Sequence, residues 1–547
     1  MTRSFRLCAL LVLSLAWTFV ASSQQSAEPI TVSPEWVEPT GDLAPGAQIV
    51  RTGQSLAIAD AIAMSIQNDL DVEVARFAPL IARADSQGVW GAYDPSISAD
   101  MGYDVAKAPN STAFFGSGVE VNRQRIKGGG AGIDQLIPYV GATLSLRYES
   151  SATATRREAF SLSDQFDSSL FFRANVPLAR NLIWSEAWTQ VKTAKIGYEG
   201  SLDDFRAALM DTVQTAVNSY WNLVAARDQV RVAQKSLETA RALLDQTKTE
   251  YEVGVVSRVE VVESEAGVAD REFDVIRVAN DYRNAQDELI DTVLGRELAA
   301  MTDLHFAPTE DPEAFELRKV DVQRAVNTAF RMRPVLRKAR LDIEQDELEL
   351  KFAKNQRLPQ FDVDLGFGYV GMSGEPNPRY AGVPSEFLGP FDQSTDDFFN
   401  NAGSDNYSVK GTFSIPFPNT TARKRVNKSE FELRRSKTQQ IRQEQEIVLQ
   451  VRKAARTLLA SAQGIQAAER RRLAAEEQLR AERIRLEHGE STPFEVLQRE
   501  SDLVEAESQK INALQTYRAA EVGLERAQGT ILDTHNVVVE EAREPAR

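Results

Sequence analysis

The chain has 547 residues with 79 acidic and 63 basic side chains, which gives a formal net charge of −16. Nucleic-acid-binding surfaces concentrate positive charge, so this balance argues against nucleic acid as a partner. Helix-forming residues dominate the sequence, whereas glycine and proline gather in a few places. This distribution favours long helices over several compact domains.

The first 23 residues have the pattern of a secretory signal peptide. Two arginines precede an apolar run over residues 7–20, and Ala21-Ser22-Ser23 supplies the small residues of a cleavage site. A membrane anchor is the alternative, but the run is shorter than the ~20 residues that span a bilayer. Cys8 is the only cysteine, so we expect a mature protein without thiols, disulfides or cysteine metal ligands.

Residues 24–54 are polar and Pro-rich with little periodicity, which predicts an extended tail. A helix is expected from Leu56, because apolar residues follow helical spacing there. We expect a kink near Pro79, since proline removes a backbone donor inside a helix, and an end at Asp94-Pro95.

Strands are predicted after this helix and again in the second half of the chain. Apolar and polar residues alternate over residues 96–105 and 361–369, and return strands follow at 170–177 and 407–416. One side of a soluble sandwich would show the same alternation. The ~10-residue lengths, the terminal aromatic residues and the export signal favour an apolar face turned to lipid and a polar lumen.

Long helices are predicted to follow both sets of strands. The segments 178–253 and 417–488 are almost wholly helix-forming, and each could build a helix roughly 100 Å long. A heptad seam runs along the first of them at Val230, Ala233, Leu237, Ala240 and Leu244. An ordinary coiled coil would also show this seam.

The chain is an internal duplication centred on two similar turns. Five pairs match when the turns are aligned: Gly254 with Gly489, Ser257 with Thr492, Glu260 with Glu495, Val261 with Val496, and Glu265 with Glu500. Each turn is expected to end a helix at a left-handed glycine and to start the next helix at a Ser or Thr cap. We assign residues 55–295 to the first copy, 296–318 to a linker, 319–533 to the second copy and 534–547 to an acidic tail.

This order resembles the TolC-like outer-membrane efflux family. The resemblance rests on the signal peptide, the duplicated helix–strand–strand–helix order, the Val-Pro or Ile-Pro after each return strand, and the Tyr-x-x-Gly-x-x-Ser turn. It covers residues 56–532. It implies an α+β membrane protein: a homotrimer that forms an outer-membrane β-barrel continuous with a long periplasmic α-helical barrel. Such a trimer docks through its tips on a periplasmic adaptor joined to an inner-membrane transporter.

The resemblance also implies roles for the residues around the two turns. Four residues are expected at the periplasmic channel mouth: Glu260, Glu263, Glu495 and Gln498. The adaptor-docking tips are expected to comprise Tyr251, Val253, Gly254, Val255 and Ser257 in the first turn and His488, Gly489, Glu490, Ser491 and Thr492 in the second. Alternatively, the carboxylates are solvated first-turn residues favoured by the helix dipole.

Three positions depart from the family pattern. Gln498 replaces an acidic residue at the mouth, Ser491 stands where some members place an arginine that locks the closed mouth, and Leu486 replaces a locking aromatic residue. These differences put the family's closed-gate mechanism in doubt for this chain.

The resulting functional hypothesis is a passive exit duct of a tripartite efflux or type I secretion system. The three histidines, His305, His488 and His535, are scattered, and no phosphate-binding loop or catalytic triad pattern is present. We therefore expect no enzyme activity, no cofactor and no metal site. A non-conducting, adhesin-like trimeric coiled coil at the cell surface is the alternative.

The number of strands is the point at which the chain could differ from the family. Residues 142–148 alternate cleanly, whereas residues 119–126 alternate poorly and precede Gly128-Gly129-Gly130. Both runs together would give six strands per chain and eighteen per trimer, instead of four and twelve. We favour twelve strands, with the extra pair projecting as a hairpin, because an Arg- and Gly-rich run makes a poor lipid-facing surface.

Overall fold

The computed structural model describes residues 54–109, 121–155, 162–295, 305–314, 317–378, 387–400 and 405–539. The expected signal peptide and most of both terminal tails lie outside these residues. The chain divides into two compact units. Unit 1 comprises Met1–Phe77, Asp203–Val335 and Gln443–Arg547, and unit 2 comprises Ala78–Leu202 and Leu336–Arg442.

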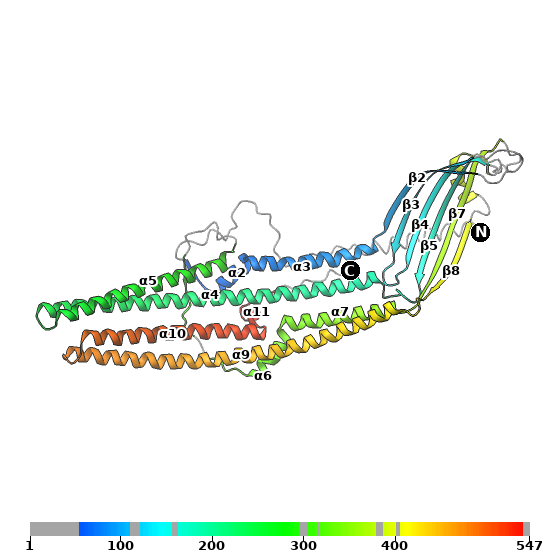
Figure 1. Cartoon of the computed structure of the whole chain (residues 1–547). Coiled ribbons are helices and arrows are strands. Elements are labelled where there is room, and N and C mark those ends of the chain that lie inside the picture. Colours follow the sequence, from blue (N-terminus) through cyan, green and yellow to red (C-terminus); the bar gives the residue numbers. More distant parts are fainter. Residues whose placement is uncertain are drawn as a thin grey trace. The chain divides into compact units, whose positions relative to one another are not determined.

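Helices account for most of the described chain (Figure 1). In chain order they are α2 (Ile58–Asn68), α3 (Leu70–Gly88), the 3-10 helix η1 (Val89–Tyr93), α4 (Glu186–Glu252), α5 (Arg258–Leu294), α6 (Val322–Met332), α7 (Pro334–Gln356), α8 (Phe391–Asn400), α9 (Thr420–Glu487), α10 (Pro493–Gln528) and α11 (Ile531–Thr534). The two longest, α4 and α9, have 67 and 68 residues and are each ~100 Å long at 1.5 Å per residue, as expected.

Each copy interrupts its first helix at one non-helical residue. Asp69 separates α2 from α3 with an extended ψ of 124°, and its carboxylate accepts a 2.7 Å hydrogen bond from the Asp71 amide. Arg333 plays the same part between α6 and α7, where Pro334 disfavours helical geometry in the preceding residue. Pro79 lies inside α3, which continues past it to Gly88, and the kink expected there stays a prediction.

The core of unit 1 joins helices to a small parallel sheet. Strand β1 (Gln54–Leu56) pairs with β6 (Phe306–Pro308), so part of the segment between the two copies is ordered structure. The Tyr220 side chain of α4 is fully buried, and its hydroxyl donates to the Leu56 carbonyl at 3.0 Å. Apolar residues of α2, α4 and α5 pack around this point.

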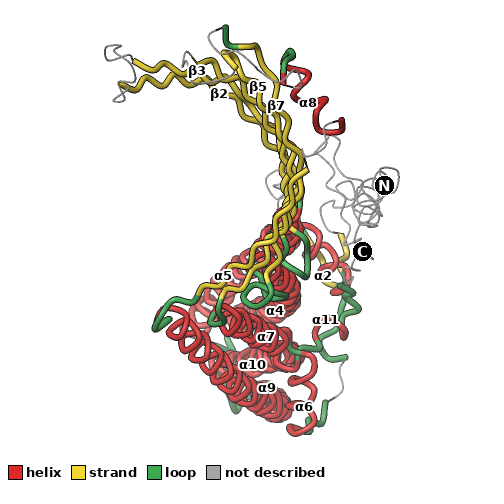
Figure 2. Tube along the Cα trace, turned by 90° about the vertical axis from the view of Figure 1, so that its right-hand side faces the viewer, coloured by secondary structure: helices red, strands yellow, loops and turns green. Residues whose placement is uncertain are grey.

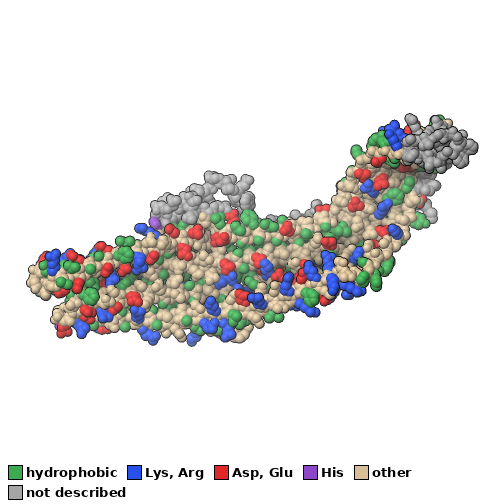
Figure 3. All heavy atoms as spheres, viewed as in Figure 1, with side chains coloured by type: hydrophobic (Ala, Val, Ile, Leu, Met, Phe, Trp, Pro, Cys, Tyr) green, Lys and Arg blue, Asp and Glu red, His purple; other side chains and the backbone are tan. Residues whose placement is uncertain are grey.

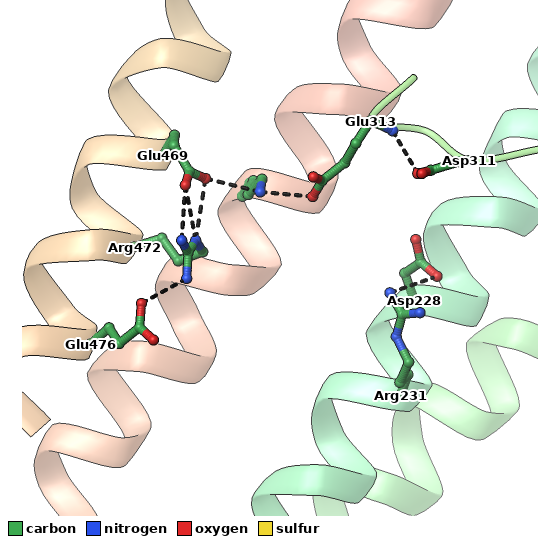
Figure 4. Close-up of polar contacts among 8 residues, drawn as sticks. Asp228, Arg231, Asp311, Glu313, Glu469, Arg472 and Glu476 are labelled. Carbon is green, nitrogen blue, oxygen red and sulfur yellow. Dashed lines mark hydrogen bonds and ion pairs between the residues drawn. The ribbon is translucent and has the colours of Figure 1, made fainter. Parts of the chain in front are cut away.

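Charged side chains connect α9, α10 and the segment before α6 in unit 1 (Figure 4). The Lys510 ammonium lies 2.7 Å from a Glu313 oxygen and 2.9 Å from a Glu469 oxygen. Arg472 also donates to Glu469, at 2.9 Å. These hydrogen bonds, first from Arg472 and then from Lys510, lower the pKa of the Glu469 carboxyl to about 2. The network therefore holds three segments of the chain together.

Unit 2 contains one six-stranded antiparallel sheet, which is curved (Figure 2). Its strands lie in the order β2 (Ser96–Pro109), β3 (Val121–Leu136), β4 (Thr143–Thr155), β5 (Leu162–Pro177), β7 (Gln360–Pro376) and β8 (Asp405–Ser414). We call the end where β5 runs into the segment before α4 the inner end of the sheet. The end where β2 finishes and β3 begins is the outer end.

The expectation that the extra pair of strands would leave the sheet as a hairpin is wrong. Strand β3 pairs with β2 over the whole length of β2, and β4 pairs with both β3 and β5. The glycines of β3 have a reason to be there: Arg147 of β4 reaches across Gly130 to Asp100 of β2, at 2.5 Å. A side chain at position 130 would crowd the Tyr148 carbonyl. Most of β3 lies beyond residues 119–126, the run in which apolar and polar residues alternate poorly.

Toward the inner end, one face of the sheet is apolar across all six strands, and we call this side of the sheet the apolar face. A directly paired row crosses it: Ile97, Ile133, Leu146, Phe172, Phe367 and Tyr407, one residue from each strand. Met101 is 93% exposed and Tyr407 is 85% exposed on this face. The opposite, polar face carries Asp100, Arg147 and Glu149. In the single chain, therefore, large apolar side chains on this face are exposed to solvent.

Helix α8 covers the outer part of the apolar face over β5 and β7. The Ser394 hydroxyl is 2.7 Å from that of Ser168 on β5, and Phe391 stacks edge-on against Phe166 at 5.7 Å between ring centroids. At the inner end, an aromatic cluster comprises Trp90, Tyr93, Tyr139 and Trp188, with centroid distances of 4.6 to 6.1 Å.

Candidate functional site

The turn between α4 and α5 ends its helix with a left-handed glycine. Gly254 has φ = 78°, the Val255 amide donates to the Glu250 carbonyl at 2.8 Å, and the Gly254 amide donates to the Tyr251 carbonyl at 3.0 Å. These two bonds define a Schellman motif, which satisfies carbonyls that a helix end otherwise leaves open.

The turn between α9 and α10 repeats this geometry. Gly489 has φ = 75°, the Glu490 amide donates to the Arg485 carbonyl at 2.8 Å, and the Gly489 amide donates to the Leu486 carbonyl at 2.9 Å. The predicted left-handed caps are therefore present at both positions. An added Cβ would meet no atom within 4 Å at either glycine, so only the backbone conformation requires glycine.

The residues after each glycine cap the next helix. Glu260 accepts hydrogen bonds from the Ser257 amide at 3.4 Å and from its hydroxyl at 3.1 Å, and the two residues form a capping box. Thr492 accepts from the Glu495 amide at 3.4 Å, and Pro493 occupies the first turn of α10. Glu260 thus has a structural partner, whereas the Glu495 carboxylate is exposed.

The four candidate mouth residues lie in the first two turns of α5 and α10. Glu260 is half-buried, and Glu263, Glu495 and Gln498 are exposed. All four belong to unit 1, so one compact body presents them together with both turns. The carboxylates of Glu263 and Glu495 are therefore accessible, whereas that of Glu260 is engaged with Ser257.

The two helical hairpins pack against each other near the turns. An apolar cluster joins Ala240 and Leu243 of α4, Leu479 of α9, and Val496 and Leu497 of α10. Leu486, which replaces the family's locking aromatic residue, packs against this cluster. The Arg271 guanidinium of α5 also hydrogen-bonds the Ser501 hydroxyl of α10. Packing of this kind fixes the turns relative to each other.

The turns themselves expose apolar side chains. Val253 is 70% exposed, Val255 is 73% exposed and Phe494 is 53% exposed, while Tyr251 is also exposed. Such side chains at the end of a helical hairpin have no packing role within the described chain. They are the kind of surface that binds another protein.

Ser491 makes a local contact in place of the arginine found in some family members. Its hydroxyl donates to Glu482 of α9 at 2.5 Å, and this bond is the main cause of a lowered pKa for the Glu482 carboxyl. The His488 ring contacts the Ile484 carbonyl at 2.9 Å. Both side chains are therefore engaged within their own hairpin.

Glu500 is a site residue that sequence reasoning matched to Glu265 but gave no role. Its side chain is buried between the hairpins, with one carboxylate oxygen lacking a hydrogen-bond partner. Burial raises the pKa of Glu500, although Arg483 and Arg271 lie close enough to oppose the rise. Exposed Glu265 instead pairs with Lys248 at 3.2 Å. The only sequence signal was the alignment of the two positions.

Two features of the described residues bear on other functions. No group of three or more His, Cys, Asp or Glu side chains within the described ranges could hold a metal ion. Among the helices that the structure describes, none combines the length and the apolar character needed to cross a membrane.

The duplicated long-helix hairpins and the six-stranded sheet define a helix-rich protein of mixed helix and sheet, a class known from several solved channels. The chain is similar to the Campylobacter jejuni CmeC outer membrane channel, with a TM-score of 0.59 and 14% identity over 92% of this chain and 95% of that one. It is similar to the open state of the Neisseria gonorrhoeae MtrE channel, with a TM-score of 0.58 and 15% identity over 93% and 99%. For the Vibrio cholerae outer membrane protein VceC the values are 0.57 and 13% over 86% and 96%. No curated protein matches the chain.

The sequence pattern of the outer membrane efflux protein family matches residues 130–295 and 325–530, more than half of the chain. The chain therefore belongs to the outer membrane efflux protein family, and the TolC-like resemblance is confirmed. It is an outer-membrane protein with a large periplasmic helical portion. The family is one of channels rather than enzymes, in agreement with the expected absence of catalysis.

Proposed function

We propose that this protein is a passive exit duct: a homotrimer that spans the outer membrane and receives its cargo from a periplasmic adaptor and an inner-membrane transporter. The observation that carries the proposal is the sheet with one apolar and one polar face, joined in one chain to two capped helical hairpins. Family membership supports the same reading. The chain itself makes and breaks no bond.

The sheet edges support assembly into a closed wall. Strands β2 and β8 are the edges of the six-stranded sheet, and each presents unpaired backbone groups along one side. In lipid every such group needs a partner, so β8 of one copy would pair with β2 of the next. Three copies would then close a wall of eighteen strands, wider than the twelve that the family resemblance implies, because diameter grows roughly linearly with strand number.

Side-chain chemistry supports the orientation of this wall. The apolar face would contact lipid, and the polar face with Asp100, Arg147 and Glu149 would line the lumen. The aromatic cluster of Trp90, Tyr139 and Trp188 at the inner end is of the kind that lies at a membrane interface. The inner end would accordingly lie at the periplasmic surface of the membrane.

The tips are proposed as the adaptor-docking surface. Exposed Val253, Val255 and Phe494 supply apolar contact area, and the two Schellman motifs hold it in a fixed shape. The carboxylates of Glu260, Glu263 and Glu495 would converge in the trimer and form acidic rings at the mouth. Converging carboxylates in a narrow pore attract cations.

Neighbouring residues of β4 test the wall directly. The mature protein is expected to lack cysteine, so Leu146→Cys and Ser145→Cys would each carry a single thiol-linked fluorophore, on the apolar and the polar face respectively. In reconstituted trimers, brominated lipids should quench the probe at position 146 strongly and the probe at position 145 weakly. Equal, weak quenching at both would show that β4 lies outside the wall and would favour twelve strands.

A further inference from the structure

Four basic side chains gather at the outer end of β2 and β3. They are Lys107, Arg123, Arg125 and Lys127, and we call them the basic rim. All four are exposed. Strand pairing sets Lys107 opposite Arg123, Val105 opposite Arg125 and Tyr103 opposite Lys127, so the four cations share one face of the sheet. Figure 3 shows a group of Lys and Arg side chains at this end of the sheet.

The basic rim has no internal counter-charge among the described residues. No described carboxylate forms an ion pair or hydrogen bond with any of its four side chains. On the next strand, Ala152 and Ala154 stand opposite Lys127 and Arg125. Directly opposed like charges such as Lys107 and Arg123 destabilise a pair of strands. The arrangement therefore favours an external anion.

The nearest acidic groups on the same face are further away. Asp164 stands opposite Ala154, one strand beyond β4, and Glu375 stands opposite Asp164 on the strand after that. At ~4.8 Å between strands, Asp164 lies two strand spacings from Arg125. Arg147 bridges an equal separation on the polar face, but among the described residues neither Asp164 nor Glu375 forms an ion pair with the basic rim.

The position of the basic rim indicates the kind of anion. The cations lie on the same face as the apolar residues of β2: Lys127 stands opposite Tyr103, and Lys107 follows Val105 along the strand. A ligand that contacts both surfaces must combine an anionic head with an apolar body. Arginine and lysine suit this position, because their aliphatic stems lie along apolar surface while their charged ends reach the head group.

We propose that the basic rim binds the phosphate groups of an anionic glycolipid in the outer leaflet of the outer membrane. The proposal rests on the proposed function, in which the apolar face contacts lipid and the inner end faces the periplasm. Arginine forms bidentate hydrogen bonds to phosphate, and basic clusters beside a membrane-facing surface bind phosphorylated head groups. The trimer would carry three such sites, one at the outer end of each copy's β2–β3 pair.

The test uses the full-length trimer in a neutral detergent, with lipid A that carries two phosphates as the probe. Binding is followed by native mass spectrometry and by fluorescence titration. Dephosphorylated lipid A and inorganic phosphate are measured in parallel, which separates lipid recognition from recognition of phosphate alone. The rim variant combines Lys107→Gln, Arg123→Gln, Arg125→Gln and Lys127→Gln.

A matched control variant removes the same charge elsewhere. It replaces four exposed basic residues of the unit 1 helices by glutamine: Lys235, Arg283, Arg452 and Arg456. Each cation beside an anionic surface contributes roughly fivefold in affinity. We expect the rim variant to bind lipid A at least tenfold more weakly than wild type, and the control variant to bind as wild type does. Dephosphorylated lipid A should bind both variants equally.

Three outcomes would overturn the proposal. Equal lipid A affinity in the rim and control variants would show that the four cations do not bind the lipid. Tight binding of dephosphorylated lipid A would show that the phosphate groups are not recognised. If the rim variant dissociates into single chains but still binds lipid A as wild type does, the basic rim would be a contact between copies of the chain. If the rim variant does not assemble, Arg125→Gln alone should still weaken binding several-fold. Channel conductance is recorded on the same samples, so a failure of the proposed function is seen separately.

Discussion

Substitution of both tip glycines tests whether the shape of the turns matters for docking. In Gly254→Val with Gly489→Val, a β-branched residue must adopt φ near 75–78°. Glycine adopts this left-handed conformation without steric strain, but valine does not. This conformation costs ~1–2 kcal/mol per residue, or about 2–4 kcal/mol per chain. A Cβ at either position would have no atom within 4 Å, so steric clash adds nothing.

Each turn can relieve this backbone strain by opening. Opening the turn gives up the two backbone hydrogen bonds of the Schellman motif, a net ~1–3 kcal/mol, which is similar to the strain that it removes. We therefore expect a folded trimer with disordered tips. Hydrogen exchange should speed up at the backbone amides of positions 254, 255, 489 and 490, and affinity for the periplasmic adaptor should fall.

Two further variants separate the backbone from the surface. Asparagine tolerates the left-handed conformation, so Gly254→Asn with Gly489→Asn should restore both exchange protection and adaptor binding. Gly464→Val lies within α9 with open space around it and should change neither, because valine suits a helix slightly better than glycine. Wild-type adaptor affinity in the double valine variant would refute the assignment of the tips as the docking surface.

Three other predictions concern charge and stability. Glu260→Gln with Glu495→Gln should lower the cation preference measured as a reversal potential in a salt gradient; no change would remove both residues from the mouth. Burial raises the pKa of Glu500 above its ordinary value, so the ionised carboxylate destabilises the fold at neutral pH. Glu500→Gln should therefore raise the thermal unfolding midpoint at neutral pH. This gain should vanish as pH falls below the usual range of a carboxyl. Lys510→Gln should lower the free energy of unfolding by about 1 kcal/mol at neutral pH, after allowance for solvent screening. The difference from wild type should shrink as pH falls from 4.5 toward 2, because Glu469 takes up its proton in this range. A difference that does not depend on pH would contradict this role of Lys510.

The turns and long helices could be predicted because their signals are local. A glycine at the end of a helical run and a Ser or Thr three residues later specify the cap chemistry without reference to the rest of the fold, and Gly254 and Gly489 have the expected geometry. The ~100 Å helices follow from uninterrupted helix-forming segments in the same way. Their packing partners near the tips, such as Leu486, were not evident.

The strand number depended on contacts that no short window contains. Strand β3 alternates poorly where its basic residues lie, and its Arg- and Gly-rich run predicted a poor lipid-facing surface. The structure shows why the glycines are accommodated: Arg147 and Asp100, 47 positions apart in the chain, meet across Gly130. Glu500 is a similar case, since its burial depends on helices from both copies.

The central claim is that three copies form a duct whose wall includes all six strands of each chain. Single-channel recording of Ser145→Cys trimers in a planar lipid bilayer tests it most directly, with a charged, membrane-impermeant thiol reagent added during the recording. The duct predicts a steady conductance that falls in three steps as the three lumenal thiols react, while Leu146→Cys trimers show no change. Trimers that insert but pass no current would contradict the duct, and a steady current with no steps at position 145 would contradict the six-strand wall.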